Sequence, residues 1–346
     1  MRGLTALFLL TCTPAIGQDW ATRDLCHTPP LPVTAEDFAP HSLDDLEARA
    51  KTFANPRGRF WKVTHANGQV SHLWGTLHAS LPSVLNLPDV AKSEIETARA
   101  LAVEIDYTYP SRDALLGRYD LPGRFIEAGD PFLPPDPTDL SFLGQDPVDW
   151  VFERFDAEGF EDAFMIYSYA GLAEFLLSDP CEDFNSGIIP TQDSLIQTFA
   201  HIADADVISL ETPDDLITDL ATEPETAKAI IALQTAYLKP PENPRNFNAS
   251  VQLYLEGRLG LMMAWDMAHM QATYGDQGLR YLEVADDYLL SIRNRRFVDR
   301  ITSELETGGV FVAVGAFHLP GETGLIALLR NDGFEVARIP LPGEAP

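Results

Sequence analysis

The stretch Val310-Phe311-Val312-Ala313-Val314-Gly315-Ala316-Phe317-His318 decides the fold. Its first five residues are all apolar, which is typical of a strand buried on both faces. A long helical pattern over residues 281–306 precedes this strand and ends at Gly308-Gly309. A short helical pattern near 323–330 and a strand-like run over 334–338 follow it. The order helix, strand, helix, strand is typical of an α/β sheet.

The N-terminal part of the chain predicts further strands. Strand-like runs over residues 60–64 and 70–74 flank Asn67-Gly68, which is a hairpin signal. Pro88 and Asp89 can open a helix that leads to a short apolar strand over 101–105. Another strand is predicted over 207–211, and Thr212 follows it as a helix cap. Strands are therefore expected in both halves of the chain.

We predict a single α/β domain over residues 57–346. Its central mixed sheet is formed by an N-terminal segment (about 57–110) and a C-terminal segment (about 280–340), with a large helical middle section (about 150–306). Residues 129–149 are rich in Pro and Asp and lack periodicity, so we expect a surface loop there. Residues 18–56 are predicted to form an irregular N-terminal arm with one short helix near 43–53.

The first 17 residues predict a secretory signal peptide. Arg2 is followed by an apolar run over residues 4–10, and Ala15-Ile16-Gly17 offers a cleavage site of small residues. We expect cleavage near Gly17 and a periplasmic or secreted protein; the alternative is a buried N-terminal helix. This run and every later one are shorter than the roughly 20 apolar residues of a transmembrane helix, so no stable membrane span is predicted.

The cysteine pattern and the charge narrow the classes of function. Cleavage would leave Cys26 and Cys181, and in an exported chain such a pair predicts a disulfide over free thiols. The formal net charge is -28, and no basic patch stands out. Binding to a nucleic-acid backbone therefore has no electrostatic basis.

A Gly-x-x-His pattern occurs twice, as Gly75 to His78 and Gly315 to His318, and each copy follows a predicted strand. Glycine tolerates backbone angles closed to other residues, so it permits a sharp turn after a strand. Three residues later a histidine can point back over the carboxyl end of the sheet, where ligands bind in open α/β folds. The alternative is a pair of strand-end histidines that hydrogen-bond neighbouring carbonyls.

Glu104 adds a third member to this set. It lies near the end of an apolar strand, where an ionised carboxylate is costly unless it is paired or coordinated. His78, His318 and Glu104 would form a two-histidine, one-carboxylate set, as in catalytic sites that leave one metal position open for water. We therefore expect one cleft that contains these three residues and a divalent metal (Mn, Co or Zn).

The sequence resembles the TraB/GumN family over roughly residues 57–340. Five elements carry the resemblance in order: His72-Leu73-Trp74-Gly75-Thr76-Leu77-His78, Ala102-Val103-Glu104-Ile105-Asp106, Leu210-Glu211-Thr212, Arg293-Asn294 and Val314-Gly315-Ala316-Phe317-His318-Leu319-Pro320-Gly321. That family is similar to the Tiki proteases, which are regarded as metal-dependent peptidases with paired Gly-x-x-His motifs and a glutamate. More distantly it resembles the erythromycin esterases and the haem-binding ChaN-like proteins.

The resemblance implies that His78, Glu104 and His318 carry the site. It also implies that Glu211 and Arg293 lie beside them and either support these residues or orient a substrate. The leading hypothesis is an exported, metal-dependent hydrolase with a peptide or protein substrate. One alternative is a metal-independent esterase or amidase in which a histidine is the base and Arg293 stabilises developing charge. Another is a non-catalytic protein that binds haem or a cell-envelope partner.

Overall fold

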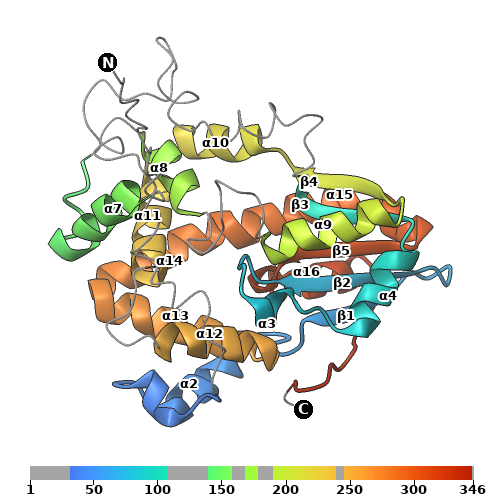
Figure 1. Ribbon diagram of the computed structural model, residues 1–346, viewed down its shortest axis with the longest axis horizontal. Coiled ribbons are helices and arrows are strands. Elements are labelled where there is room, and N and C mark those ends of the chain that lie inside the picture. Colours follow the sequence, from blue (N-terminus) through green and yellow to red (C-terminus); the bar gives the residue numbers. More distant parts are fainter. Residues whose placement is uncertain (1–31, 107–138, 158–167, 178–189, 239–244, 345–346) are drawn as a thin grey trace, which may run out of the picture.

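The computed structural model describes residues 32–106, 139–157, 168–177, 190–238 and 245–344 (Figure 1). The predicted signal peptide, Cys26 and Cys181 lie outside the described residues, so the expected cleavage and disulfide stay predictions. Among the described helices, none is both long and apolar enough to cross a bilayer.

Within the described residues, six strands form one mixed sheet, as predicted. They are β1 (Phe60–Thr64), β2 (Val70–Thr76), β3 (Ala100–Ile105), β4 (Asp206–Glu211), β5 (Val310–Gly315) and β6 (Glu335–Arg338), in the order β4-β3-β5-β2-β1-β6. The two expected segments provide five of them. The sixth, β4, comes from the middle section and joins the sheet at the edge beside β3.

The four strands β4, β3, β5 and β2 run parallel to one another. Strand β1 is antiparallel to both β2 and β6, and β6 forms the edge of the sheet opposite β4. In the parallel part, Thr76 is in register with Gly315, and Ile105 is in register with Glu211. The carboxyl ends of these four strands therefore meet at one edge.

Helices cover both faces of the sheet because alternate strand residues point to opposite sides. On one face, α4 (Asp89–Thr97) and α9 (Gln192–Ile202) pack against a cluster that includes Trp74, Leu101 and Phe311. On the other face lie α15 (Arg293–Thr307) and α16 (Leu325–Asn331). Their buried side chains share one core with the strands, including Phe297, Ile301, Ile326, Leu73 and Val312.

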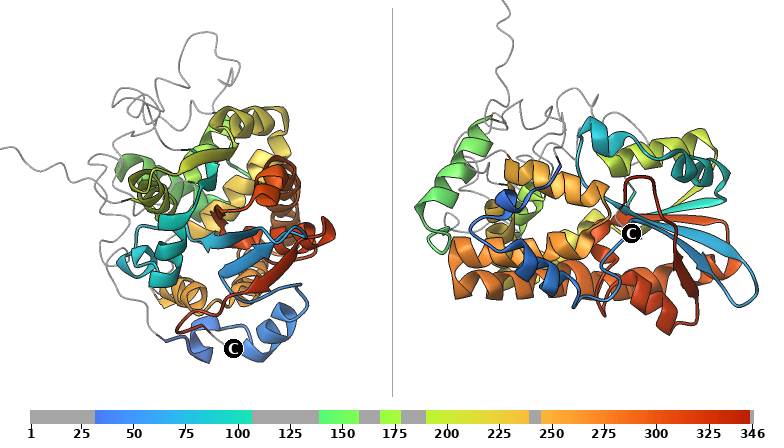
Figure 2. Two further views of the ribbon diagram at one scale, coloured as in Figure 1. Left: turned by 90° about the vertical axis from the view of Figure 1, so that its right-hand side faces the viewer. Right: turned by 90° about the horizontal axis from the view of Figure 1, so that it is seen from below.

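The middle section is largely helical, and most of it lies beside the sheet (Figures 1 and 2). Besides α9 and α15, its described helices are α7 (Gln145–Ala157), α8 (Tyr169–Leu176), α10 (Pro213–Thr222), α11 (Pro224–Leu238), α12 (Arg245–Leu255), α13 (Leu259–Tyr274) and α14 (Asp276–Asp286). Thr212 caps α10 as predicted: its hydroxyl accepts from the Asp215 amide at 3.2 Å, and Asp215 accepts from the Thr212 amide at 2.9 Å.

Part of the predicted loop over 129–149 is instead helical. Helix α7 begins at Gln145, because Trp150 and Val151 are buried against α8, α10 and α11 in a second apolar core. The rest of that loop lies mainly outside the described residues. Before the sheet, the N-terminal arm contains η1 (Ala35–Phe38) and α2 (Leu43–Ala50), and α3 (Pro82–Leu85) follows β2.

The long helix predicted over 281–306 contains a π-helical segment. This segment, η3 (Asp287–Ile292), connects α14 directly to α15. Such a segment shifts the helical register, and π-helical turns are frequent at functional sites. Arg293 and Asn294, the first two residues of α15, are both buried and face the carboxyl edge of the sheet.

Candidate functional site

The five predicted site residues converge at the carboxyl edge of the parallel strands. His78 lies two residues beyond β2, Glu104 lies in β3, and Glu211 ends β4. His318 ends the short η4 (Ala316–His318) that follows β5, and Arg293 begins α15. Each of the four parallel strands therefore brings one site residue to the carboxyl edge of the sheet, where ligands bind in open α/β folds.

Glu104 is the centre of the cluster. Its Oε1 lies 3.7 Å from Nε2 of His78 and 3.5 Å from Nε2 of His318. The two histidine nitrogens therefore cannot be farther apart than the sum of these distances. The same oxygen accepts the backbone N–H of Gly315 at 2.6 Å. Both Gly-x-x-His motifs thus contact one carboxylate.

Arg293 connects Glu104 to Glu211. Its Nη2 donates to Oε2 of Glu104 at 2.6 Å, and its Nε donates to Oε2 of Glu211 at 3.0 Å. Nη2 also pairs with Oε1 of Glu211, and Nη1 donates to the carbonyl of Leu289 at 3.3 Å. The guanidinium is buried and its donors point to protein oxygens, so it fixes the orientation of both carboxylates.

Two residues that the sequence did not assign to the site hold the histidines from behind. Asp193, in the first turn of α9, has Oδ2 at 2.8 Å from Nδ1 of His78. Asn294 has Oδ1 at 2.6 Å from Nδ1 of His318. The sequence signal for each is weak: Asp193 has the pattern of an ordinary acidic residue at a helix start, and Asn294 follows Arg293 in a family element. Both histidines consequently turn Nε2 toward Glu104.

The two histidines differ in environment. The side chain of His318 is 4% exposed and packs against the ring of Phe297, with ring centres 5.2 Å apart. Burial lowers the pKa of His318 to about 3, despite the opposing effect of Glu104. The side chain of His78 is 53% exposed. Although desolvation opposes its charge, Asp193 and Glu104 outweigh that effect and raise the pKa of His78 to about 9.

The carboxylates are electrostatically unequal. Burial disfavours the charge on Glu104, but His318, Arg293, His78 and the Gly315 N–H hold its pKa well below the usual range. Burial raises the pKa of Glu211, and the contacts with Arg293 oppose that rise. Glu104 is therefore ionised at neutral pH at the centre of the cluster.

The two motifs need glycine for close packing, and not for the sharp turn that was predicted from the sequence. Gly315 has φ -49° and Gly75 is not among the residues with positive φ, so neither needs the backbone freedom of glycine. A Cβ on Gly315 would lie 2.9 Å from Nε2 of His78, and a Cβ on Gly75 would lie 2.8 Å from Cδ1 of Leu319. Each glycine therefore leaves room for the other motif.

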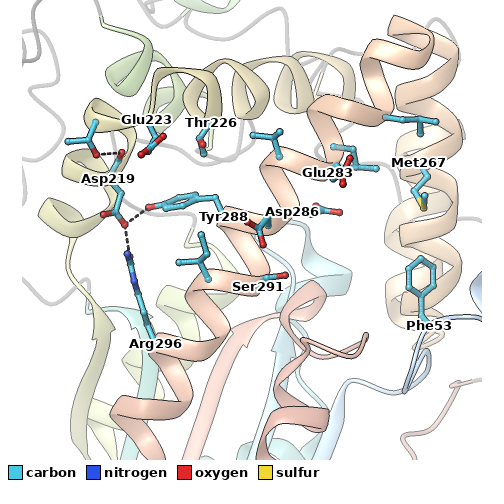
Figure 3. A pocket seen from close by; sticks show the side chains of 16 residues that line it. Phe53, Asp219, Glu223, Thr226, Met267, Glu283, Asp286, Tyr288, Ser291 and Arg296 are labelled. Carbon is cyan, nitrogen blue, oxygen red and sulfur yellow. Dashed lines mark hydrogen bonds and ion pairs between the residues drawn. The ribbon is translucent and has the colours of Figure 1, made fainter.

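A separate cavity of about 1100 Å³ lies along α14 and η3 (Figure 3). It contains none of the five predicted site residues. In it, Asp219 accepts from the hydroxyl of Tyr288 at 3.1 Å and pairs with Arg296. Glu223, Asp286 and apolar side chains from α13 and α14 complete much of the lining.

The geometry of the cluster comes close to that of a metal site without matching it. Across the described ranges, no group of three or more His, Cys, Asp or Glu side chains is arranged so that it could hold a metal ion as it stands. Two atoms bound to one metal at about 2.1 Å and a tetrahedral angle lie about 3.4 Å apart. Oε1 of Glu104 lies 3.5 and 3.7 Å from the two histidine nitrogens, slightly farther than this spacing.

Fold and site together define an α/β protein with two histidines and a glutamate at the carboxyl edge of a parallel sheet. The family model of the TraB/PrgY/gumN family matches residues 59–338, so this chain belongs to that family. The match covers all six strands and every residue of the cluster. A search of curated proteins found no match, and neither did a search of solved structures.

Proposed function

We propose that this protein is an exported, metal-dependent hydrolase that cleaves amide bonds of peptides or proteins. His78, His318 and Glu104 are the proposed metal ligands. The observation that carries the proposal is the orientation of His318, whose Nε2 faces an ionised carboxylate oxygen.

Asn294 supports one tautomer of His318. Its Nδ2 donates to the carbonyls of Thr323 at 2.9 Å and of His318 at 3.3 Å, which assigns Oδ1 to the side that faces the imidazole. An amide oxygen only accepts hydrogen bonds, so Nδ1 of His318 carries the proton. Because the pKa of His318 is about 3, the ring is neutral at pH 7 and Nε2 has a lone pair.

A lone pair 3.5 Å from an ionised carboxylate oxygen is repulsive unless a cation, or a water molecule that donates to both atoms, relieves the contact. A divalent metal would remove this repulsion, and the donor set of two imidazole nitrogens and one carboxylate oxygen suits Zn, Co or Mn. Hydrogen bonds to both Nδ1 atoms are also the usual environment of metal-binding histidines. These points support a metal site at this cluster.

A bound divalent ion would polarise a substrate carbonyl and lower the pKa of water toward 7. The protein's own groups have separate tasks. The side chains of His318 and Glu104 are only 4% and 11% exposed and are hydrogen-bonded, so they would keep a fixed geometry. His78 is half exposed and forms the side of the cluster that a substrate can approach. Arg293 and Glu211 would hold Glu104, since the donors of Arg293 already point to protein oxygens.

The metal-independent hydrolase is less well supported. It requires a neutral, accessible histidine as the general base near pH 7. Without a metal, His78 is accessible but its pKa of about 9 makes it charged, and His318 is neutral but buried. A divalent metal would displace the proton from Nε2 of His78, which the metal-independent reaction has no group to do. Hydrolysis that survives chelators would favour this alternative, and a Soret band on titration with haem would favour a haem-binding role.

The experiment is metal analysis of the purified protein, followed by titration with Co²⁺. We expect about one equivalent of metal in the wild type and loss of binding in His78→Ala and His318→Ala. His269→Ala is the matched control, because His269 lies on α13 and contacts the carbonyl of Ala236 instead. Undiminished binding in both site variants would remove these ligands from consideration.

Hydrolysis and export need their own measurements. A mixed peptide library should be cleaved by the metal-loaded protein and left intact after chelation. Mass analysis of the protein from the periplasmic fraction should find a chain that begins near Gln18. A full-length chain retained in the cytoplasm would contradict export.

A further inference from the structure

Helix α9 brings a carboxylate to the back of His78. Its N-cap, Thr191, accepts from the Ser194 amide at 3.4 Å, and Asp193 is the second residue of the helix. The helix start is anchored to β2 through Gln192, whose Oε1 accepts from Nε1 of Trp74 at 3.3 Å and from the Leu77 amide at 3.2 Å. Asp193 therefore projects from a fixed point.

The carboxylate of Asp193 is held at both oxygens. Oδ1 accepts the hydroxyl of Thr76 at 2.6 Å, and Oδ2 contacts Nδ1 of His78 at 2.8 Å. Thr76 is 1% exposed at the end of β2, and the side chain of Asp193 is 12% exposed. The hydrogen bonds from Thr76 to Asp193 and between Asp193 and His78 thus link the buried end of β2 to the exposed imidazole ring of His78.

His78 has more need of such a contact than His318. The ring of His318 is enclosed by Phe297 and the core of the sheet, whereas about half of the His78 side chain faces solvent. Packing therefore defines the orientation of His318 but constrains His78 only on one side. A hydrogen bond to Nδ1 fixes both the tautomer and the ring plane of a ligand histidine.

We propose that Asp193, held by Thr76, is a positioning residue that directs Nε2 of His78 toward Glu104. This inference rests on the proposed metal-dependent function. His78 can therefore lie on an exposed turn and still keep one ring orientation, because a residue of α9 holds it. That residue, Asp193, is 115 residues away from His78 in the chain.

The test compares two substitutions at one position. Asp193→Ala removes the acceptor and should weaken Co²⁺ binding by about 10- to 100-fold. Asp193→Asn keeps an oxygen acceptor for His78 and an amide that can donate to Thr76, so it should retain most of the affinity, as Asn294 does for His318. Asp206→Ala, at the exposed start of β4, is the control and should bind as the wild type does.

A second readout uses the metal-free protein. Long-range ¹H–¹⁵N spectra of ¹⁵N-histidine-labelled samples report which ring nitrogen of His78 carries a proton. Above pH 9, where the His78 ring loses its charge, we expect the Nδ1-protonated tautomer in the wild type and in Asp193→Asn, and a mixture of both tautomers in Asp193→Ala. Thr76→Val should shift the same resonances partway, because Asp193 loses one of its two anchors.

The outcomes separate the two proposals. Equal Co²⁺ affinity in the wild type and Asp193→Ala would overturn the role of Asp193 and leave the metal-dependent function standing. No Co²⁺ binding by the wild type would overturn the metal-dependent function, and the spectra would then decide about Asp193. Unchanged His78 spectra in folded Asp193→Ala would overturn its positioning role.

Discussion

Replacing Arg293 with methionine should lower the free energy of unfolding by about 3–5 kcal/mol at pH 7, the usual cost of removing one partner from a buried ion pair. Arg293 donates to Glu104 at 2.6 Å and to Glu211 at 3.0 Å, and the side chains of Arg293 and Glu211 are 9% and 3% exposed. Methionine fills a similar volume, so the loss reports mainly the removal of the cation that Glu104 and Glu211 share.

The loss should depend on pH and on Glu211. In the wild type the pKa of Glu104 is lowered, so its charge stabilises the fold above the unfolded pKa of about 4.5, and this contribution is lost as pH falls toward the folded value. Without Arg293, both carboxyls should take up protons more readily, and the difference from the wild type should shrink toward pH 5. Adding Glu211→Gln should recover part of the loss at pH 7.

Urea unfolding followed by circular dichroism measures these differences, with the slope of the transition used to check that both variants unfold similarly. Arg300→Met is the matched control on the same helix. Its ion pair with Asp215 is long, at 3.5 Å, and the two side chains are 44% and 42% exposed. The guanidinium also donates to the carbonyl of Leu210, so about 1–2 kcal/mol should be lost, less than in Arg293→Met. A loss below about 1 kcal/mol in Arg293→Met, or one that Glu211→Gln does not change, would refute the reasoning.

Two further changes have defined outcomes. Gly315→Ala should abolish Co²⁺ binding while circular dichroism stays near that of the wild type, because the new Cβ would lie 2.9 Å from His78 Nε2 and 3.2 Å from Glu104 Oε1; binding at wild-type affinity would contradict the packing argument. Burial raises the pKa of Asp286 from 3.8 to about 7, so this carboxyl binds a proton in the folded state, and stability should fall as pH rises from about 4 to 7. Asp286→Asn should reduce the slope of stability against pH and should be more stable than the wild type above pH 7 by on the order of 1–3 kcal/mol. The exposed Asp287→Asn should have neither effect. Equal slopes for the wild type and Asp286→Asn in thermal melts across this pH range would contradict the prediction.

The strands and their order along the chain were readable from the sequence because buried strands are short apolar runs. The fully apolar run that became β5 and the hairpin signal at Asn67-Gly68 gave element positions within about two residues of those observed. The sequence placed the helical middle section outside the sheet, yet β4 from that section pairs with β3. Strand pairing between segments 100 residues apart is a tertiary choice that local patterns do not encode.

The site was predictable where its residues lie at strand ends. His78, Glu104, Glu211 and His318 all follow or end apolar runs, so their convergence follows from the parallel sheet. Asp193 was not predictable, because an acidic residue in the first turn of a helix is ordinary capping chemistry. Its role depends on α9 packing against the sheet, which the sequence around it does not show.

The two Gly-x-x-His motifs act as one interlocked unit rather than as two copies of a turn. In the sheet, Gly315 is in register with Thr76, one residue beyond Gly75, so the two motifs are offset by one position. Gly315 consequently faces the histidine of the first motif, and Gly75 faces the turn that carries the histidine of the second. A side chain at either glycine would disturb the opposite motif. Since β2 and β5 are neighbours that lie more than 230 residues apart in the chain, the site can form only when the N- and C-terminal segments have paired. The pairing of β2 with β5 that completes the sheet therefore also brings the two histidines together.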